Sequence, residues 1–454
     1  MGSTKFHFAS ALTGNGWQDD VTVAVDAAGM IASVQAGWKA GLHIKGIAVP
    51  AVPNVHSHAH QRLMQGLAER AGPGADSFWT WREAMYGFAL RLSPDDFQAV
   101  AAQLYVEMLK AGFSVVGEFQ YLHHQPDGSP YANPAEMSLN CLAAAEQAGI
   151  AITLLPALYA HGGFGGQPPV AGQRRFITDA ERFLAIYDRL RAEAKGHDLR
   201  RVGISPHSLR AVTPDLLREV IGGIDEASPI HIHVAEQTRE VDDCIAFCGQ
   251  RPVEMLIEQF DLSPRWTAIH ATHMTVDETA RLAKSGAIAG LCPTTEANLG
   301  DGIFPAVEYL KNHGSIAIGS DSQISVSPAE DIRMLEYSQR LRDRTRNALA
   351  AGPDQSTGRT LFDAICRGGA QSMTQPVGAI AAGYRADIMV LDADHPALIG
   401  RAQDAALDTW IFSGGNSCVK DMIVGGRHVV KDRHHAHEDT IARNFRAALG
   451  RLST

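Results

Sequence analysis

Residues 51–58, AVPNVHSH, begin the part of the sequence that decides the fold, because they form the first of eight short apolar runs. The other runs are SVVGEF (114–119), ITLLPALY (152–159), RVGISPH (201–207), PIHIHVAE (229–236), TAIHAT (267–272), AIAGLCP (287–293) and SIAIGSD (315–321). Helical segments such as PDDFQAVAAQLYVEMLKAG (94–112) separate them. Continuous apolar runs are typical of parallel strands that are buried on both faces. Eight such strands alternating with helices predict an α/β fold with a (β/α)8 barrel of the TIM type.

A doubly wound open sheet is the alternative architecture for the same alternation. The glycine-rich turn of a dinucleotide-binding fold does not follow the first run, which favours the barrel. Periodicity alone does not choose between the two.

The two ends of the chain carry a different pattern. VTVAVDAAGMIASV (21–34) alternates apolar and small residues around a turn, and ADIMVLDADHP (386–396) and MIVGGRHVVKD (422–432) also resemble strands and a hairpin. We therefore expect a second, smaller β-sandwich-like domain, built from residues 1–50 and from residues 376–454, which include a terminal helix. Residues 51–375 then form the catalytic barrel.

Composition and charge exclude several classes of protein. The chain has 454 residues, 40 of them basic and 50 acidic, and a net charge of −10, with no block of Lys and Arg that would bind nucleic acid. The first residues do not resemble a signal peptide, and no stretch approaches the roughly 18 apolar residues of a membrane span. Six scattered cysteines do not form a disulfide framework. We expect a cytoplasmic protein with no membrane or nucleic-acid partner.

Polar side chains stand where the predicted strands end, which is where barrel enzymes carry their catalytic groups. These residues are His56, His58, Glu118, Tyr121, His207, His233, Glu236, His270 and Asp321. His56 and His58 face the same side of one strand, because side chains alternate along a strand. With His233 and Asp321 they make a nitrogen and oxygen ligand set that suits Zn²⁺, with Fe²⁺ or Mn²⁺ as further possibilities.

Four of these stretches resemble the amidohydrolase superfamily, in the branch that uses one metal ion for deamination: HSHAHQR (56–62), HIHVAE (231–236), IHATH (269–273) and GSDS (319–322). DSFWTWREAMY (76–86), HSLRAVTP (207–214), TEANLGDGIFP (295–305) and LRDRTRN (341–347) are similar to the N-formimino-L-glutamate deiminases of that superfamily. The similarity extends over nearly the whole chain.

The resemblance implies a role for each matching residue. His56, His58, His233 and Asp321 would bind one divalent metal ion, and Glu236, His270 and Asp321 would be catalytic. Hydroxide on the metal would attack the formimino carbon, and Glu236 would deliver a proton to the departing nitrogen. N-formimino-L-glutamate and water would give N-formyl-L-glutamate and ammonia, a step of histidine degradation.

The resemblance also implies which residues bind this dicarboxylate substrate. Arg82 and Arg210 would pair with its carboxylates, because a guanidinium group binds a carboxylate through two hydrogen bonds. Gln61, Tyr121 and His207 would assist them. His60 lies beyond the end of the first strand, so we expect it to pack beside the metal ligands rather than to join them.

Two other functions stay open. The same mechanism could act on another amidine, a guanidine or a purine-like ring, although a purine site would favour stacking over two guanidinium groups. A barrel that has lost catalysis and serves in binding is the other alternative, which the retention of all six metal and proton-transfer residues disfavours. Members of the family are often dimers, so a homodimer is expected from the resemblance alone.

Overall fold

The structure is a computed structural model that describes residues 4–38, 40–69 and 78–452. Asp76 and Ser77, which begin one of the stretches quoted above, lie outside the described residues.

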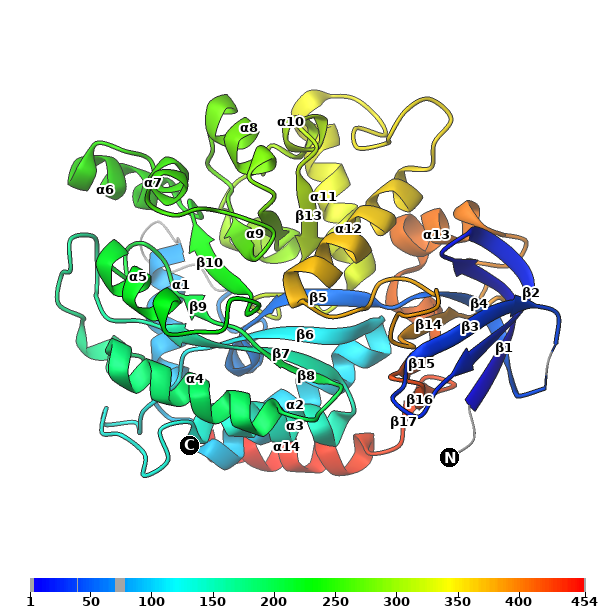
Figure 1. Cartoon of the computed structure of the whole chain (residues 1–454), viewed down its shortest axis with the longest axis horizontal. Helices are drawn as coiled ribbons and strands as arrows, with labels where there is room; N and C mark the ends of the chain where they lie inside the picture. Colours follow the sequence, from blue (N-terminus) through cyan, green and yellow to red (C-terminus); the bar gives the residue numbers. More distant parts are fainter. Residues whose placement is uncertain (1–3, 39, 70–77, 453–454) are drawn as a thin grey trace.

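Parallel strands form two sheets in the middle of the chain (Figure 1). One sheet has the order β5-β6-β7-β8, with β9 also paired to β7, and the other has the order β10-β11-β12-β13. The strands are β5 (Val52–Ser57), β6 (Phe113–Gln120), β7 (Ala151–Leu158), β8 (Arg200–Val202), β9 (Ser205–Pro206), β10 (Ile230–Val234), β11 (Trp266–His270), β12 (Ile288–Leu291) and β13 (Ser315–Ile318). This arrangement confirms the predicted α/β class with parallel strands.

Isolated parallel bridges join the two sheets at both edges. Ser57 pairs with Asp321 at one edge, and Ile204 with Ile230 and Ser208 with His233 at the other. The bridge at Asp321 is supported by backbone hydrogen bonds to His56 and His58.

One predicted strand, residues 201–207, is divided into the two short strands β8 and β9. Gly203 lies between them, where an added Cβ atom would come within 2.5 Å of the Pro229 carbonyl oxygen. The close approach of that backbone interrupts the ladder, which periodicity in the sequence does not reveal.

Helices connect the parallel strands and cover them (Figure 1). They are α1 (Phe78–Ala89), α2 (Pro94–Ala111), α3 (Glu136–Ala148), α4 (Ala180–Ala194), α5 (Pro214–Gly222), α6 (Thr238–Cys248), α7 (Pro252–Gln259), α8 (Val276–Lys284), α9 (Pro293–Leu299), α10 (Ala306–Lys311), α11 (Pro328–Asp343) and α12 (Thr357–Met373). Short turns η1 (Ala59–Met64) and η2 (Ala171–Gln173) lie in the loops after β5 and β7.

Helix α2 shows why such segments begin and end where they do. The Ser93 side chain accepts a hydrogen bond from the Asp96 N–H, and Pro94 occupies the first turn, so the helix start is capped. Gly112 ends the helix with φ 112°, in the left-handed region. A Cβ atom at Gly112 would lie 2.4 Å from Met389 Sδ, so glycine also lets the helix end against the terminal sheet.

Strands from both ends of the chain form one eight-stranded sheet, at the right of Figure 1. Its order is β17-β16-β15-β14-β4-β1-β2-β3. The strands are β1 (Thr4–Thr13), β2 (Gly16–Val25), β3 (Ile31–Ala36), β4 (Leu42–Pro50), β14 (Ile388–Leu391), β15 (Val419–Val424), β16 (Arg427–Lys431) and β17 (His434–His435). Phe6, Phe8, Val23, Ile388 and Ile423 belong to a hydrophobic cluster separate from the main core. The strands of this sheet therefore share a small hydrophobic core of their own.

The C-terminal segment returns to the helices of the parallel sheets. It contains α13 (Asp404–Thr409), η3 (Trp410–Gly414), η4 (Gly415–Cys418) and α14 (Glu438–Leu452). Helix α14 lies along α2 (Figure 1). Lys110 Nζ lies 2.7 Å from Glu438 Oε2, and Arg451 Nη2 lies 2.5 Å from Asp96 Oδ1.

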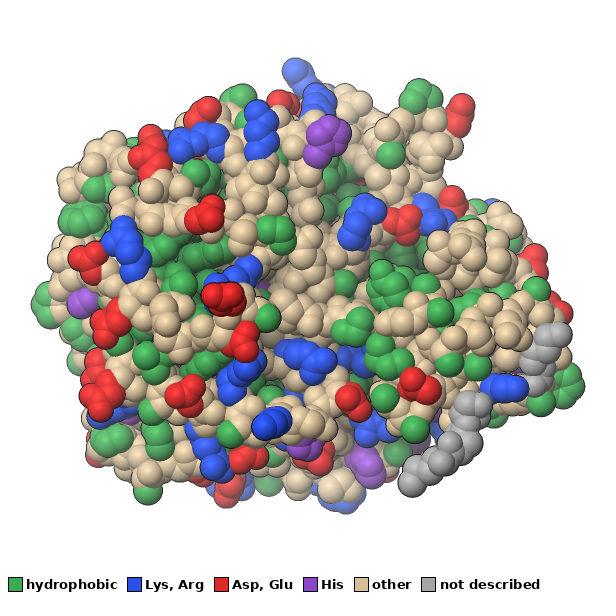
Figure 2. All heavy atoms as spheres, viewed as in Figure 1, with side chains coloured by type: hydrophobic (Ala, Val, Ile, Leu, Met, Phe, Trp, Pro, Cys, Tyr) green, Lys and Arg blue, Asp and Glu red, His purple; other side chains and the backbone are tan. Residues whose placement is uncertain are grey.

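Basic and acidic side chains are interspersed over the face shown in Figure 2, without a large patch of one sign. Within the described parts of the chain, no helix is both long enough and apolar enough to cross a membrane.

Candidate active site

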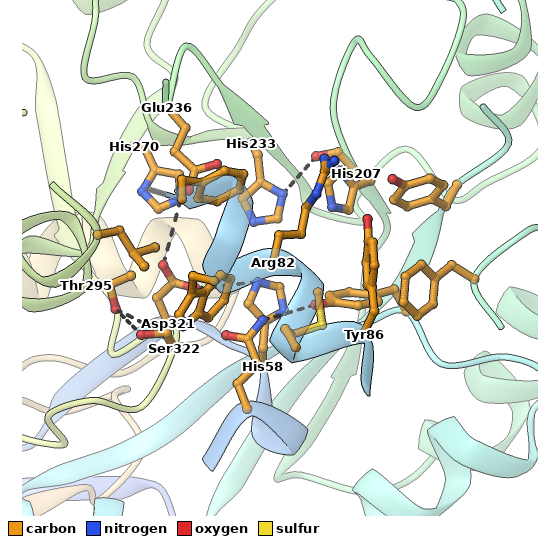
Figure 3. A pocket seen from close by; sticks show the side chains of 18 of the residues that line it. His58, Arg82, Tyr86, His207, His233, Glu236, His270, Thr295, Asp321 and Ser322 are labelled. Carbon is orange, nitrogen blue, oxygen red and sulfur yellow. Dashed lines mark hydrogen bonds and ion pairs between the residues drawn. The ribbon is translucent and has the colours of Figure 1, made fainter. Parts of the chain in front are cut away.

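Histidine and carboxylate side chains meet where the parallel strands end. His56 lies on β5 and His58 directly follows that strand, while His233 is on β10 and Asp321 follows β13 by three residues. All four side chains are buried. Figure 3 shows His58, His233 and Asp321 pointing toward a common region. The strands therefore bring the four predicted metal ligands together.

The ligand atoms of these residues are close enough to share one ion. His56 Nε2 lies 3.1 Å from His233 Nε2 and 3.4 Å from Asp321 Oδ1. His58 Nε2 lies 3.5 Å from the same Asp321 oxygen. The three imidazoles form a group whose nitrogens all lie within 4.8 Å of one another. Three imidazoles and one carboxylate are a fitting set for a divalent transition metal.

Backbone carbonyls fix the orientation of two of the rings. His58 Nδ1 donates to the Phe119 carbonyl oxygen at 3.0 Å, and His233 Nδ1 donates to the His207 carbonyl oxygen at 2.9 Å. A carbonyl only accepts, so the proton of the neutral ring is on Nδ1 and the lone pair is on Nε2. This is the arrangement that metal-binding histidines adopt.

Burial also favours the neutral, metal-binding form of these histidines. It is the main reason that the pKa of His56 is lowered and that the pKa values of His58 and His233 are well below their usual range. Burial acts in the opposite direction on Asp321, but the hydrogen bond and charge of His56 lower the pKa of this carboxyl. The site thus offers three neutral rings and one carboxylate.

His60 stands apart from this group. No metal-binding group among the described residues includes it, and its ring lies edge-on to Tyr121 with centroids 5.0 Å apart. Burial, with a smaller effect of the Arg175 charge, lowers the pKa of His60 to about 3. Neither ring nitrogen has a hydrogen-bond partner within the described parts of the chain. Its packing beside Tyr121 agrees with a role outside the ligand set.

His270, at the end of β11, lies between three carboxyl groups. Its Nε2 is 3.8 Å from both Glu236 Oε1 and Asp321 Oδ2, and its Nδ1 is 3.2 Å from Glu296 Oε1. Burial would lower the pKa of His270, but the Glu236 charge and the Glu296 hydrogen bond raise it to about 10. Burial raises the pKa of Glu236 to about 7. Proton donors and acceptors therefore lie directly beside the ligand set.

The backbone is strained around these residues. Ala235, His270, Ala271 and Asp321 all have φ between 48° and 68°, a left-handed backbone conformation that residues other than glycine rarely adopt. Such residues cost on the order of 1–3 kcal/mol each and gather at functional sites. The strain marks this rim of the sheets as a site selected for something other than stability.

A cavity adjoins the ligand set. Its lining includes every predicted residue of substrate binding, namely Gln61, Arg82, Tyr121, His207 and Arg210. It also includes His58, His233, Glu236, His270 and Asp321 (Figure 3). One cavity thus gathers both groups of predicted residues except His56, which is fully buried.

The two arginines present unused donors in this cavity. Arg82 on α1 stacks on Trp79, with its Cζ 4.5 Å from the ring centroid, and Arg210 Nε lies 4.0 Å from Glu240 Oε1. The Nε atoms of Arg82 and Arg210 are buried and lack a hydrogen-bond partner among the residues that the structure describes. Buried donors without an acceptor are costly, so an anionic ligand would stabilise them.

Gln61 and Tyr121 form a pair in the same wall. Gln61 Nε2 donates to the Tyr121 hydroxyl at 3.0 Å, and the Tyr121 ring lies 5.9 Å from the His207 ring. Burial, followed by the charge of Arg210, holds the pKa of His207 well below its usual range. A neutral His207 can donate a hydrogen bond from one nitrogen and accept one at the other.

Sequence reasoning missed two acidic residues of this site. Glu296, on α9, accepts hydrogen bonds from His270 and from the Cys292 N–H at 2.9 Å. Burial raises the pKa of Asp301 to about 9, and Gln237, next to Glu236, donates to its carboxyl group. Both lie in the quoted stretch TEANLGDGIFP. Their position after a strand end was the available signal.

Three comparisons relate this chain to known proteins. A family model described as "Amidohydrolase family" matches residues 47–429. Formimidoylglutamate deiminase of Pseudomonas aeruginosa is 51% identical over 446 residues, which are 97% of this chain and 98% of that protein. The crystal structure of an amidohydrolase from Brucella melitensis is 47% identical, with a TM-score of 0.94 over 99% of this chain and 100% of the other.

A more distant structure shares the fold alone. An adenosine deaminase from Xanthomonas campestris with bound zinc has a TM-score of 0.83 at 19% identity, over 100% of this chain and 99% of that one.

Proposed function

The chain belongs to the amidohydrolase family, and from this premise we propose that it hydrolyses N-formimino-L-glutamate to N-formyl-L-glutamate and ammonia. The observation that carries the proposal is the 51% identity to a formimidoylglutamate deiminase over nearly the full length of both chains. The cavity with Arg82 and Arg210 suits a substrate with two carboxylates. The protein is thus a hydrolytic deaminase that acts on a C–N bond of a linear amidine.

The architecture proposed for this enzyme is one (β/α)8 barrel made from both parallel sheets. The bridges Ser57–Asp321 and Ser208–His233 support closure at the two edges. The domain division into residues 1–50, 51–375 and 376–454 is part of the same proposal. It is supported by the change from the terminal sheet to the parallel sheet between Pro50 and Val52.

The proposed metal ligands are His56, His58, His233 and Asp321, and Zn²⁺ is the proposed ion, with Fe²⁺ or Mn²⁺ as alternatives. The short distances between their ligand atoms and the Nδ1 hydrogen bonds of His58 and His233 support this assignment. When bound, such an ion lowers the pKa of a coordinated water from 15.7 to about 7.

The proposed proton-transfer residues are Glu236, His270 and Asp321. Water adds its oxygen to the formimino carbon, and the C–N bond to the terminal nitrogen breaks. Glu236 accepts one proton from the water and delivers it to the terminal nitrogen. The second proton passes from the added hydroxyl to the same nitrogen through Asp321, so that the formyl C=O bond forms as ammonia leaves. His270, held by Glu296, stabilises the charges of Glu236 and Asp321, from which its Nε2 is 3.8 Å away.

The proposed substrate-binding residues surround the remaining part of the cavity. Arg82 and Arg210 bind the two carboxylates through their Nε and Nη donors. Gln61, Tyr121 and His207 add hydrogen bonds from neutral groups. The cytoplasmic location and the homodimer expected from the sequence stay predictions.

An ammonia-release assay tests the proposed activity on the purified protein. We expect turnover of N-formimino-L-glutamate, at least about tenfold slower turnover of formiminoglycine, and none of guanine. The tenfold difference corresponds to about 1.4 kcal/mol, which is modest for the loss of one carboxylate that binds a buried arginine. Equal rates on the glutamate and glycine derivatives would contradict the arginine assignments, and turnover of guanine alone would contradict the substrate.

A further inference from the structure

A second hollow, which we call the outer pocket, adjoins the cavity of the active site. Its lining includes the aromatic residues Trp79, Phe164 and Phe247 and the arginines Arg82, Arg210 and Arg239. Arg82 and Arg210 line the inner cavity as well, so these two side chains form a wall that both spaces share. The elements around the outer pocket are α1, α6 and the loops after β7 and β9.

Three guanidinium groups gather around one indole in the outer pocket. The Cζ atoms of Arg82, Arg239 and Arg210 lie 4.5, 4.6 and 6.0 Å from the Trp79 ring. Cations stack favourably on an indole face, which holds the like charges near one another. Trp79 therefore keeps Arg239 beside the two arginines of the inner cavity.

The charge of this pocket is opposite to that of the whole chain. Three arginines and one aspartate, Asp243, line it, whereas the chain has a net charge of −10. A positively charged pocket on a protein of net negative charge focuses the electric field and raises the local concentration of anions. An anion that approaches this protein thus meets attraction at the outer pocket.

Arg239 is available to such an anion. Its side chain is 64% exposed, and its ion pair with Asp243, at 3.6 Å, is also exposed. Exposed ion pairs contribute little to stability, so a carboxylate ligand can replace Asp243 at little cost. Phe164, stacked on Phe247 with centroids 6.0 Å apart, forms the opposite wall.

We propose that the outer pocket is a carboxylate-binding site on the route of the substrate, with Arg239 as the residue that receives the dicarboxylate before Arg82 and Arg210 bind it. This inference rests on the proposed function for the identity of the substrate. The ligand class is a small dicarboxylate, held by guanidinium groups. Arg239 touches no group of the ligand set, so it acts in capture and not in the chemical step.

The test compares Arg239→Gln with the parent enzyme at about 10 mM and about 1 M ionic strength, where the Debye length falls from about 30 Å to about 3 Å. We expect kcat/KM for N-formimino-L-glutamate to fall about three- to tenfold at low ionic strength and less than about twofold at high ionic strength. We expect kcat to stay within about twofold of the parent value.

Arg189→Gln is the matched control. Arg189 is 52% exposed and forms an ion pair with Glu193, four residues along α4, so the substitution makes the same charge change on a similar helix surface. Its kcat/KM should equal that of the parent. Equal losses in both variants, an unchanged kcat/KM in Arg239→Gln, or a loss that persists at high salt would overturn the proposal.

Failure of the proposed function gives a different result. The parent enzyme would then release no ammonia from N-formimino-L-glutamate at any salt concentration. Calorimetric titration with glutarate, a dicarboxylate without the reactive group, tests the outer pocket independently of turnover. Weaker binding by Arg239→Gln than by Arg189→Gln would support the site, and equal binding would overturn it.

Discussion

Two of the three rings of the proposed metal site are oriented by backbone carbonyls of neighbouring segments. His58 is held by the carbonyl of Phe119, on the adjacent strand, and His233 by the carbonyl of His207. These acceptors belong to the backbone, so no side-chain substitution removes them directly. The orientation of these rings therefore depends on the register of β5, β6 and β10. The proton-transfer residues, in contrast, are held by contacts between their own side chains.

Substitution of Glu236 and His233 separates proton transfer from metal binding. Glu236→Gln keeps the size of the side chain but removes its charge, so we expect metal content to be retained and kcat to fall by about 10²–10⁴. His233→Ala removes a ring nitrogen 3.1 Å from His56 Nε2, so both metal content and turnover should fall. Elemental analysis and the ammonia assay measure the two effects. If Glu236→Gln turned over substrate as fast as the parent enzyme, another residue would have to be the one that transfers the proton.

His56 and His58 could be assigned from sequence because a strand of known direction places alternate residues on one side. His60 is predicted to lie outside the ligand set, and in the structure it lies in η1, beyond the end of β5. Glu296 could not be assigned, because its contact with His270 depends on how α9 turns after β12. Sequence periodicity specifies strands well but does not specify the loops that follow them.

Strand β6 is joined to β5 through one buried carboxyl group. Glu118 accepts hydrogen bonds from Ser57 Oγ at 2.7 Å, from the Ala59 N–H at 2.7 Å and from Tyr105 Oη at 3.1 Å. Burial raises the pKa of Glu118 to about 7 in spite of these bonds. The carboxyl group thus holds the end of β5, where the metal ligands begin, but its ionised form is disfavoured.

The stability of the protein should depend on pH through Glu118. The pKa is near 4.5 in the unfolded chain and about 7 in the folded one, so the folded state binds the proton more tightly. The contribution of Glu118 to stability is then full below about pH 4.5 and declines by about 3 kcal/mol as pH rises to about 7. Above pH 7 it changes no further.

Glu118→Gln removes this dependence, because glutamine has the shape of the protonated acid and does not ionise. We expect the thermal unfolding midpoint of the variant to rise relative to the parent between pH 5 and pH 7. Differential scanning calorimetry at several pH values measures the difference. A constant difference across this range would show that Glu118 does not titrate there.

The eight apolar runs all became parallel strands, because burial on both faces requires a continuous apolar segment. The division of residues 201–207 into β8 and β9 could not be foreseen, since it depends on the approach of the Pro229 carbonyl to Gly203. Tertiary contacts of this kind decide strand ends, and the one local signal was Gly203 itself, because a glycine inside a strand can mark a close backbone approach.

A buried polar cluster connects the terminal sheet to the parallel strand β7. Arg385 and Asp387 are each 1% exposed and form two parallel hydrogen bonds, of 2.9 and 2.6 Å. Arg385 also donates to Gln375, whose amide reaches Thr153 Oγ1 on β7 at 2.9 Å. Asp387 accepts from the Gly425 N–H at 2.9 Å, in the turn between β15 and β16. One ion pair thus connects both sheets.

A double-mutant cycle on this pair tests how the two parts are joined. Arg385→Leu and Asp387→Leu each leave one buried charge without its partner, so each should lower the free energy of unfolding by about 3–5 kcal/mol. The double variant removes both charges, and we expect it to lose less than the sum of the two single losses, because neither charge then remains buried alone. Urea denaturation of the four proteins measures the coupling. The hydrogen bonds of the pair go to Gln375 and Gly425 and not to His56 or Asp321, so metal content should stay unchanged in every variant that folds. Additive losses would show that Arg385 and Asp387 stabilise the two sheets separately, through Gln375 and Gly425, and not through each other.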